Sequence, residues 1–234
     1  MNKKNELARR IYNQKTVEKI NVKITLLGVY NKLETMEFLN MRLLSCFIIF
    51  FLALYIFDFG YIIAPISVIL SYYLIEKILL DDKIKNRKMK LESDAMHFFE
   101  VLTLSLETGR NLEEALNVTI GSIDSELSLE FKEAIRETKF GKSLKESLLD
   151  MQKRIPSESI NNIILALTQA NIYGSSIIET MYNQVDYLRE KRKLEIKAEI
   201  SKVPIKISII SVLFFVPLVL LIILGPVLLS YIGY

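Results

Sequence analysis

The sequence contains few side chains whose types and spacing could carry out chemistry. His97 and Glu100 lie three residues apart, a spacing that places two metal ligands on one face of a helix. His97 is the only histidine and Cys46 the only cysteine, so a four-ligand zinc site is not expected. We therefore predict that His97 is a partly buried helix residue and that the protein binds no metal or cofactor. An enzyme centred on His97 and Glu100 is the weakest functional hypothesis.

Recognised catalytic and phosphate-binding motifs are absent from the sequence. It has neither the Gly-x-x-x-x-Gly-Lys-Ser/Thr phosphate loop nor the Gly-x-Ser-x-Gly nucleophile turn. The formal net charge of +3 and the lack of tryptophan do not favour a nucleic-acid partner. These features predict a protein that is not an enzyme.

Acidic residues offer two further candidates. Glu126, Glu130, Glu133 and Glu137 recur at helical spacing, which predicts a solvated helix face or, alternatively, an acidic docking face. Asp58 interrupts an apolar segment and would be an ion-pathway residue if the protein were a small oligomeric channel or transporter. Because Asp58 is followed by Phe and Gly, we expect it to lie in a turn at the membrane surface instead.

The apolar segments determine where these side chains can lie. Residues 43–75 carry one charge, Asp58, and at about 1.5 Å per residue a single helix of this length would exceed a hydrocarbon layer about 30 Å thick. We predict a transmembrane hairpin over 38–80, with spans at 38–57 and 60–80 and a turn at 58–60. Cys46 is expected to be a small apolar residue within the first span.

The sequence after Lys206 carries no charge, so 204–234 is predicted to contain a third span at about 205–231. Pro217 should kink this helix.

The distribution of basic residues predicts the orientation. Residues 1–42 hold nine Lys and Arg and residues 76–206 hold the other 21. Basic residues are enriched on the cytoplasmic side of a membrane protein, so the N-terminus and 81–203 are expected in the cytoplasm and the C-terminus outside. Arg42 and Lys77 are expected to reach toward the cytoplasmic interface. Segment 1–37 is predicted to be either an amphipathic basic helix on anionic lipid or a partly ordered arm.

Residues 81–203 have the apolar spacing of helices and no sustained strand-like alternation. The fold class is therefore an all-α membrane protein, with three transmembrane helices and a six-helix cytoplasmic bundle between the second and third. We expect the last helix to be broken at Pro204. The six predicted bundle helices are 91–108, 112–121, 125–139, 143–154, 157–172 and 176–201.

Three similar turns separate helices of this bundle. In each, a glycine that can end a helix is followed after two residues by an Asn or Ser, and three residues further by a Glu that can complete a capping box. The polar residue after each glycine is a candidate partner-facing position, or is merely solvated. The turn residues are Gly109, Asn111, Glu114, Gly141, Ser143, Glu146, Gly174, Ser176 and Glu179, and the candidate partner-facing residues are Arg110, Lys142 and Ser175.

The order of these elements resembles the type II secretion system F-domain family, most closely its TadC-like branch, which serves tight-adherence (Flp) type IV pili. The similarity covers about 33–230. It includes an opening helix and first turn at 94–116, with the Gly-x-Asn-Leu-x-Glu-Ala-Leu pattern at 109–116, and a closing helix from Glu179 to Pro204. Members that carry the bundle twice differ from this chain, which carries it once.

The resemblance implies an inner-membrane platform protein that docks a cytoplasmic hexameric ATPase and couples it to pilin extraction and filament assembly. The implied partners are this ATPase, pilin subunits, membrane lipid, and a second copy or a sister single-bundle platform protein. An archaeal flagellar or pilus platform of the same superfamily is the alternative.

Overall fold

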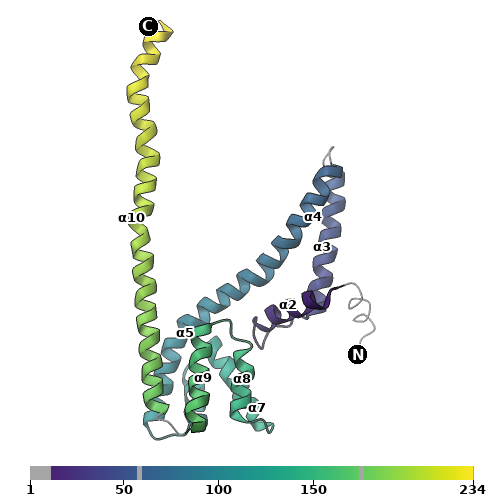
Figure 1. The fold of residues 1–234 in the computed structure, drawn as a ribbon, viewed down its shortest axis with the longest axis vertical. Coiled ribbons are helices and arrows are strands. Elements are labelled where there is room, and N and C mark those ends of the chain that lie inside the picture. The colour runs from purple at the N-terminus through teal and green to yellow at the C-terminus, as the bar shows by residue number, and fades with distance from the viewer. Residues whose placement is uncertain (1–11, 57–59, 174–176, 234) are drawn as a thin grey trace. The chain divides into compact units, whose positions relative to one another are not determined.

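The computed structural model describes residues 12–56, 60–173 and 177–233, and all regular structure in these ranges is helical. The predicted all-α class is therefore confirmed. The helices α2 to α10 are shown in Figure 1, together with a short π-helical segment, η1. Their bounds are α2 Gln14–Thr25, α3 Thr35–Ile56, α4 Gly60–Glu76, η1 Lys77–Asp81, α5 Asp82–Glu107, α6 Leu112–Ser122, α7 Glu126–Lys139, α8 Leu144–Gln152, α9 Glu158–Tyr173 and α10 Ile177–Ile232.

Three helices are long and apolar enough to cross a membrane: Thr35–Ile56, Tyr61–Glu107 and Ile177–Pro226. This agrees with the three spans expected from the sequence. α3 and α4 pack side by side as a hairpin (Figure 1). Asp58 lies outside the described residues, so its predicted place in a turn remains a prediction.

The second candidate span and the first predicted bundle helix form one continuous helical segment. α4 passes through η1 into α5, without the interval at 81–90 that the sequence analysis left between span and bundle. Residues 77–108 contain no glycine or proline, and Lys, Arg, Leu and Glu in this stretch favour helix. The loss of hydrophobicity at residue 81 therefore marks a change of environment and not the end of a helix.

Helices α5 to α9 pack into a compact helical body. α5 contacts α6, α7 and α9, while α7 contacts α6 and α8. The predicted apolar stripes face the core, where the ring of Phe131 stacks on Phe98 with centroids 4.7 Å apart and meets Phe99 edge to face at 6.1 Å. All three rings are fully buried, so they form the centre of the body.

The final helix differs from its prediction in two respects. α10 continues through Pro204, Pro217 and Pro226, so the break expected at Pro204 is wrong. Proline keeps a helical φ and removes a single backbone hydrogen bond, so a strongly helical sequence on both sides can continue the helix. Second, the predicted sixth bundle helix, 176–201, does not lie wholly within the helical body. The compact unit that contains the body ends at Val185, and Asp186–Tyr234 form a second unit. Only the first turns of α10, where Met181 and Val185 are buried, belong to the first unit.

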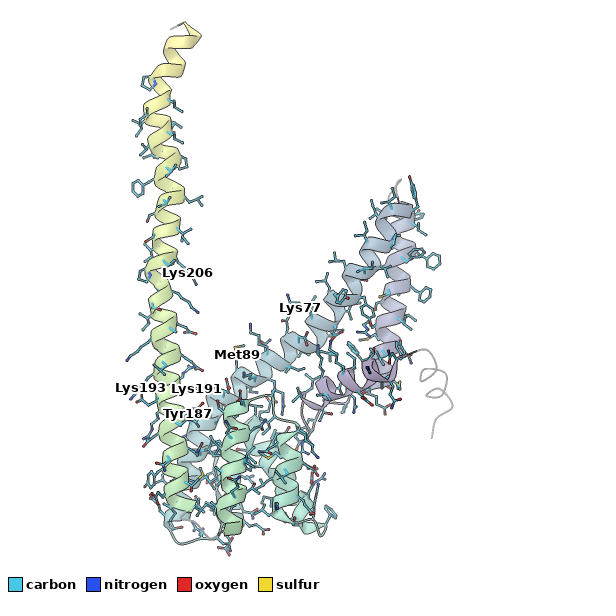
Figure 2. All side chains as sticks on the ribbon, viewed as in Figure 1. Lys77, Met89, Tyr187, Lys191, Lys193 and Lys206 are labelled. Carbon is cyan, nitrogen blue, oxygen red and sulfur yellow. The ribbon has the colours of Figure 1, made fainter. Side chains whose placement is uncertain are left out.

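The apolar part of α10 lies in the second unit. Side chains project outward along this helix, among them those of Lys191, Lys193 and Lys206 nearer its start (Figure 2). An apolar helix of this length is suited to the hydrocarbon layer of a membrane.

The described part of the N-terminal segment is ordered. α2 buries Ile20 and Ile24 against Phe38, Leu39 and Leu80, which belong to α3 and η1. Residues 14–25 therefore form a helix, while the predicted contact of this segment with anionic lipid stays a prediction. The apolar side of this helix covers protein.

We predict that Phe131→Ala will lower the free energy of unfolding by about 3–5 kcal/mol, because it removes a fully buried ring from a close-packed core. Phe140→Ala is the matched control, since Phe140 is 83% exposed and should change stability by less than about 0.5 kcal/mol. Denaturant unfolding of the full-length protein in detergent measures both. Equal losses for the two variants would contradict this assignment of the core.

Candidate functional site

Arg87 lies at the centre of a buried ion-pair network. It precedes Leu91 by one helical turn and so begins the buried stripe of α5, with its side chain only 7% exposed. Its Nε contacts Glu126 Oε1 and its Nη2 contacts Glu130 Oε1, both at 2.6 Å. Nη1 donates to the backbone carbonyls of Leu26 and Arg154, at 2.8 and 2.6 Å. Each guanidinium nitrogen is thereby satisfied.

Glu130 accepts hydrogen bonds from three directions. Besides Arg87, its carboxylate accepts from the backbone N–H of Val29 at 3.1 Å and from Arg154 Nε at 3.0 Å. Its side chain is 3% exposed. The network therefore joins the segment after α2 to α5, α7 and the connection between α8 and α9.

The prediction of a solvated acidic face on α7 is consequently wrong. Glu130 is buried, and Glu126 and Glu137 are partly buried in ion pairs. A sequence signal for this existed, because Glu130 lies three residues after Leu127 and four before Ala134, within the apolar stripe of the same helix. Arg87 likewise extends the apolar stripe of α5 by one turn. A charge at each of these two buried positions requires a partner of opposite charge, so Arg87 and Glu130 are candidates for pairing with each other.

The network extends as far as the second predicted turn. Arg154 Nη1 lies 3.6 Å from Glu137, and Lys142 Nζ lies 2.5 Å from both Glu137 and Asp150. Hydrogen bonds from Lys142 and Lys153 lower the pKa of Asp150 from 3.8 to about 2. The stabilising effect of the ionised carboxylate is therefore present above about pH 4 and lost as the pH falls toward 2.

The predicted turn residues adopt cap geometry where the structure describes them. Gly109 and Gly141 have φ values of 82° and 93°, the left-handed conformation that ends a helix. Ser143 and Glu146 form a reciprocal capping box, whereas the Asn111 side chain accepts from the Glu114 N–H at 2.9 Å, the first half of such a box. Of the third turn, Gly174, Ser175 and Ser176 lie outside the described residues, and Glu179 is an exposed residue in the first turn of α10.

The candidate partner-facing residues have different environments. Arg110 is exposed, and its Nη1 donates to Thr108 Oγ1 at 3.2 Å within the same turn. Lys142 is held by its two carboxylates, so its charge is neutralised within the protein. One helix cap was not predicted. The Ser125 side chain accepts from the Ser128 N–H at the start of α7.

A second ion-pair cluster lies at the base of the hairpin. Arg42 is 1% exposed, contacts Glu76 Oε2 at 3.0 Å and donates to the hydroxyl of Tyr72 at 2.8 Å, so its charge is paired within the protein, while its place near the cytoplasmic interface stays a prediction. Lys23 Nζ of α2 contacts both Glu76 at 2.7 Å and Asp81 at 2.6 Å. A helix-propensity argument could not detect these pairs, because their members are 34 to 58 residues apart in sequence.

The structure does not bring the remaining candidate reactive side chains, His97 and Cys46, together in one site. His97 is exposed on α5, which corrects the prediction of a partly buried histidine. In the described parts of the chain, no three His, Cys, Asp or Glu side chains are grouped so that they could hold a metal ion. Cys46 is buried between α3 and α4, with its sulfur 3.8 Å from Ser71 Oγ.

We predict that Arg87→Met will destabilise the protein by about 3 kcal/mol or more, because buried carboxylates and two backbone carbonyls lose their donor. Arg136→Met is the control. Its pair with Glu133 has the same 2.6 Å separation but its side chain is 64% exposed, so solvent screens the pair and its loss should change stability far less. Thermal unfolding of both variants in detergent measures the difference, and similar losses would show that burial of Arg87 does not matter.

Comparison with known proteins identifies the family. The family model "Type II secretion system (T2SS), protein F" matches residues 98–225, which is more than half of the chain. No curated protein and no solved structure matches the chain significantly. The matched residues include the C-terminal part of α5 from Phe98 onward, the whole of α6 to α9, and α10 through its apolar part. The chain therefore belongs to the type II secretion system protein F family.

Proposed function

We propose that the protein is an inner-membrane platform of a type IV pilus or type II secretion-like machine. The observation that carries this proposal is that the family match covers both the helical body and the apolar part of α10. The resemblance to the TadC-like branch supports assigning it to tight-adherence (Flp) pili. An archaeal flagellar or pilus platform is the alternative within the same superfamily.

In this role the protein transmits force and catalyses no reaction itself. A cytoplasmic hexameric ATPase would dock on the helical body, and its movement would pass to the membrane helices. Continuous helices suit this task, because α4, η1 and α5 connect the hairpin to the body, and α10 extends from Met181 and Val185 into its apolar segment. The Arg87 network supports movement of the body as one piece, since it ties α5 to α7 and to the α8–α9 connection.

The platform would be completed by another chain. The helical body occurs once in this sequence, and α10 carries one apolar segment long enough to cross a membrane. We propose that a second copy or a sister single-bundle protein packs on this segment, and that pilin subunits are extracted from the surrounding lipid.

The proposed orientation has the N-terminus and the helical body in the cytoplasm and the C-terminus outside. Six Lys and Arg in 77–90 and seven in 189–206 support it, because basic residues flanking spans are retained in the cytoplasm. A reporter enzyme active only outside the cytoplasm should therefore work when fused after Tyr234, and should be inactive when inserted after Gly141. The reverse pattern would invert the membrane topology.

The docking proposal is tested by deletion and by charge reversal. Deletion of the gene should abolish surface filaments, and the full-length chain in detergent should co-purify with the assembly ATPase of the same cell.

Arg110→Glu should reduce ATPase recovery severalfold, because Arg110 is an exposed cation at a turn. Lys132→Glu makes the same charge change at an exposed position on α7 and should have little effect. Retained filaments after deletion would rule out the platform role.

A further inference from the structure

A π-helical segment joins the membrane hairpin to the helical body. η1 covers Lys77–Asp81, between α4 and α5, and the Asp82 N–H bonds to the Lys77 carbonyl five residues earlier. Lys77 marks the start of this joint in Figure 2. A π-helical turn inserts one residue relative to an α-helix, is rarely stable by itself, and is often found at functional positions. Contacts from outside the helix must therefore stabilise it here.

Lys23 supplies the most direct of these contacts. Its ammonium lies 2.7 Å from the carboxylate of Glu76, the residue immediately before η1, and 2.6 Å from that of Asp81, the last residue of η1. One side chain of α2 thus bridges the two ends of the π-helical segment. The Lys23 side chain is only 20% exposed, so these pairs are screened less by solvent than surface pairs.

Apolar packing reinforces the same contact. Ile20 and Ile24 lie on either side of Lys23 in α2 and pack on Leu80 of η1, which is fully buried. At the hairpin, the Tyr12 hydroxyl donates to the carbonyl of Leu39 at 2.8 Å. Tyr12 and residues of α2 therefore contact both the hairpin and the joint.

The other end of this segment is fixed to the helical body. Arg87 binds the Leu26 carbonyl, and Glu130 accepts the Val29 N–H. Gly28, with φ at 95°, approaches so closely that an added Cβ would lie 2.5 Å from Arg87 Nη2 and 2.9 Å from Glu130 Oε1. Arg87 cannot move aside easily, because four partners hold its guanidinium.

We propose that residues 12–31 form a brace that fixes the direction of the hairpin relative to the helical body, with Lys23 as the positioning residue of the π-helical joint. The brace lies outside the family match at 98–225. Without the brace, η1 converts to α-helix and the extra residue of the π-helical turn is lost from the joint. The hairpin and the helical body then rotate relative to each other by about 100° about the helix axis, the rotation of one α-helical residue. The proposed function gives this joint its importance, since force between body and membrane would pass through it.

Distance measurements on the full-length chain test the brace. Two spin labels are attached at Tyr61→Cys on α4 and Lys132→Cys on α7, in a Cys46→Ala background and in lipid nanodiscs. Lys23→Met removes the ammonium but keeps most of the stem. It should shift the mean distance between the labels and broaden its distribution.

Lys19→Met is the matched control. Lys19 belongs to the same helix and faces the same Glu76 carboxylate, but at 3.7 Å and with 67% of its side chain exposed, so the distances should not change. A second label pair, Lys132→Cys with Lys145→Cys, lies within the body and should keep its distance in every variant. Unchanged distances in Lys23→Met would overturn the proposal. So would an equal change in both label pairs, because the loss would then be general unfolding.

Gly28→Ala tests the other end of the brace without altering a charge. It should shift the same Tyr61–Lys132 label distance, because the added methyl group displaces the segment from Arg87 and Glu130. Gly141→Ala is its control, since Gly141 has a similar φ of 93° but nothing within 4 Å of an added Cβ. An unchanged distance in Gly28→Ala would show that residues 26–30 do not hold the brace.

The two proposals can fail separately, because the distance measurement needs neither ATPase nor pilin. If Lys23→Met shifts the distance while deletion of the gene leaves surface filaments intact, the brace stands and the platform role falls. If deletion abolishes filaments while Lys23→Met changes neither distance nor filament number, the platform role stands and the brace falls.

Discussion

The burial of one guanidinium constrains much of this structure. Arg87 cannot be neutralised by losing a proton, so removing it from water requires that its donors meet acceptors within the protein. The four acceptors come from three parts of the chain: two carboxylates of α7, the Leu26 carbonyl after α2, and the Arg154 carbonyl after α8. The planar, forked shape of arginine suits several acceptors at fixed angles, which a lysine could not replace. Satisfying Arg87 therefore requires these segments to converge.

This convergence adds directional contacts to the apolar packing of the helical body. The stacked rings of Phe98 and Phe131 supply apolar contact between α5 and α7, and the Arg87 network joins the same two helices from a position about three turns before Phe98 on α5. Apolar packing alone tolerates small sliding movements, whereas a hydrogen-bonded ion pair fixes direction. A body that holds its shape in this way can pass a displacement from one surface to a helix attached elsewhere.

The N-terminal segment connects several parts of the chain through the same contacts. It lies before the residues that define the family match, yet it contacts the hairpin, the π-helical joint and the helical body. The two ion-pair clusters, one at Arg87 and one at Glu76, are connected through α2 and the residues that follow it. The geometry of the membrane hairpin is therefore coupled to the body by residues distant in sequence, and both clusters must form together.

Local sequence determined much of the secondary structure and the turns. The three apolar segments, the helical periodicity of the body and the left-handed glycines at 109 and 141 depend on residues within a few positions of one another, so they could be predicted. The continuity of α4 into α5 and of α10 through Pro204 could not be predicted in this way. A drop in hydropathy marks a change of environment and a proline removes one hydrogen bond, but neither always ends a helix. The exposure of His97 and the burial of Arg42, Arg87 and Glu130 were decided only by the tertiary structure. A charged side chain is buried or solvated according to whether its partner is within reach, and those partners lie up to 101 residues away along the chain.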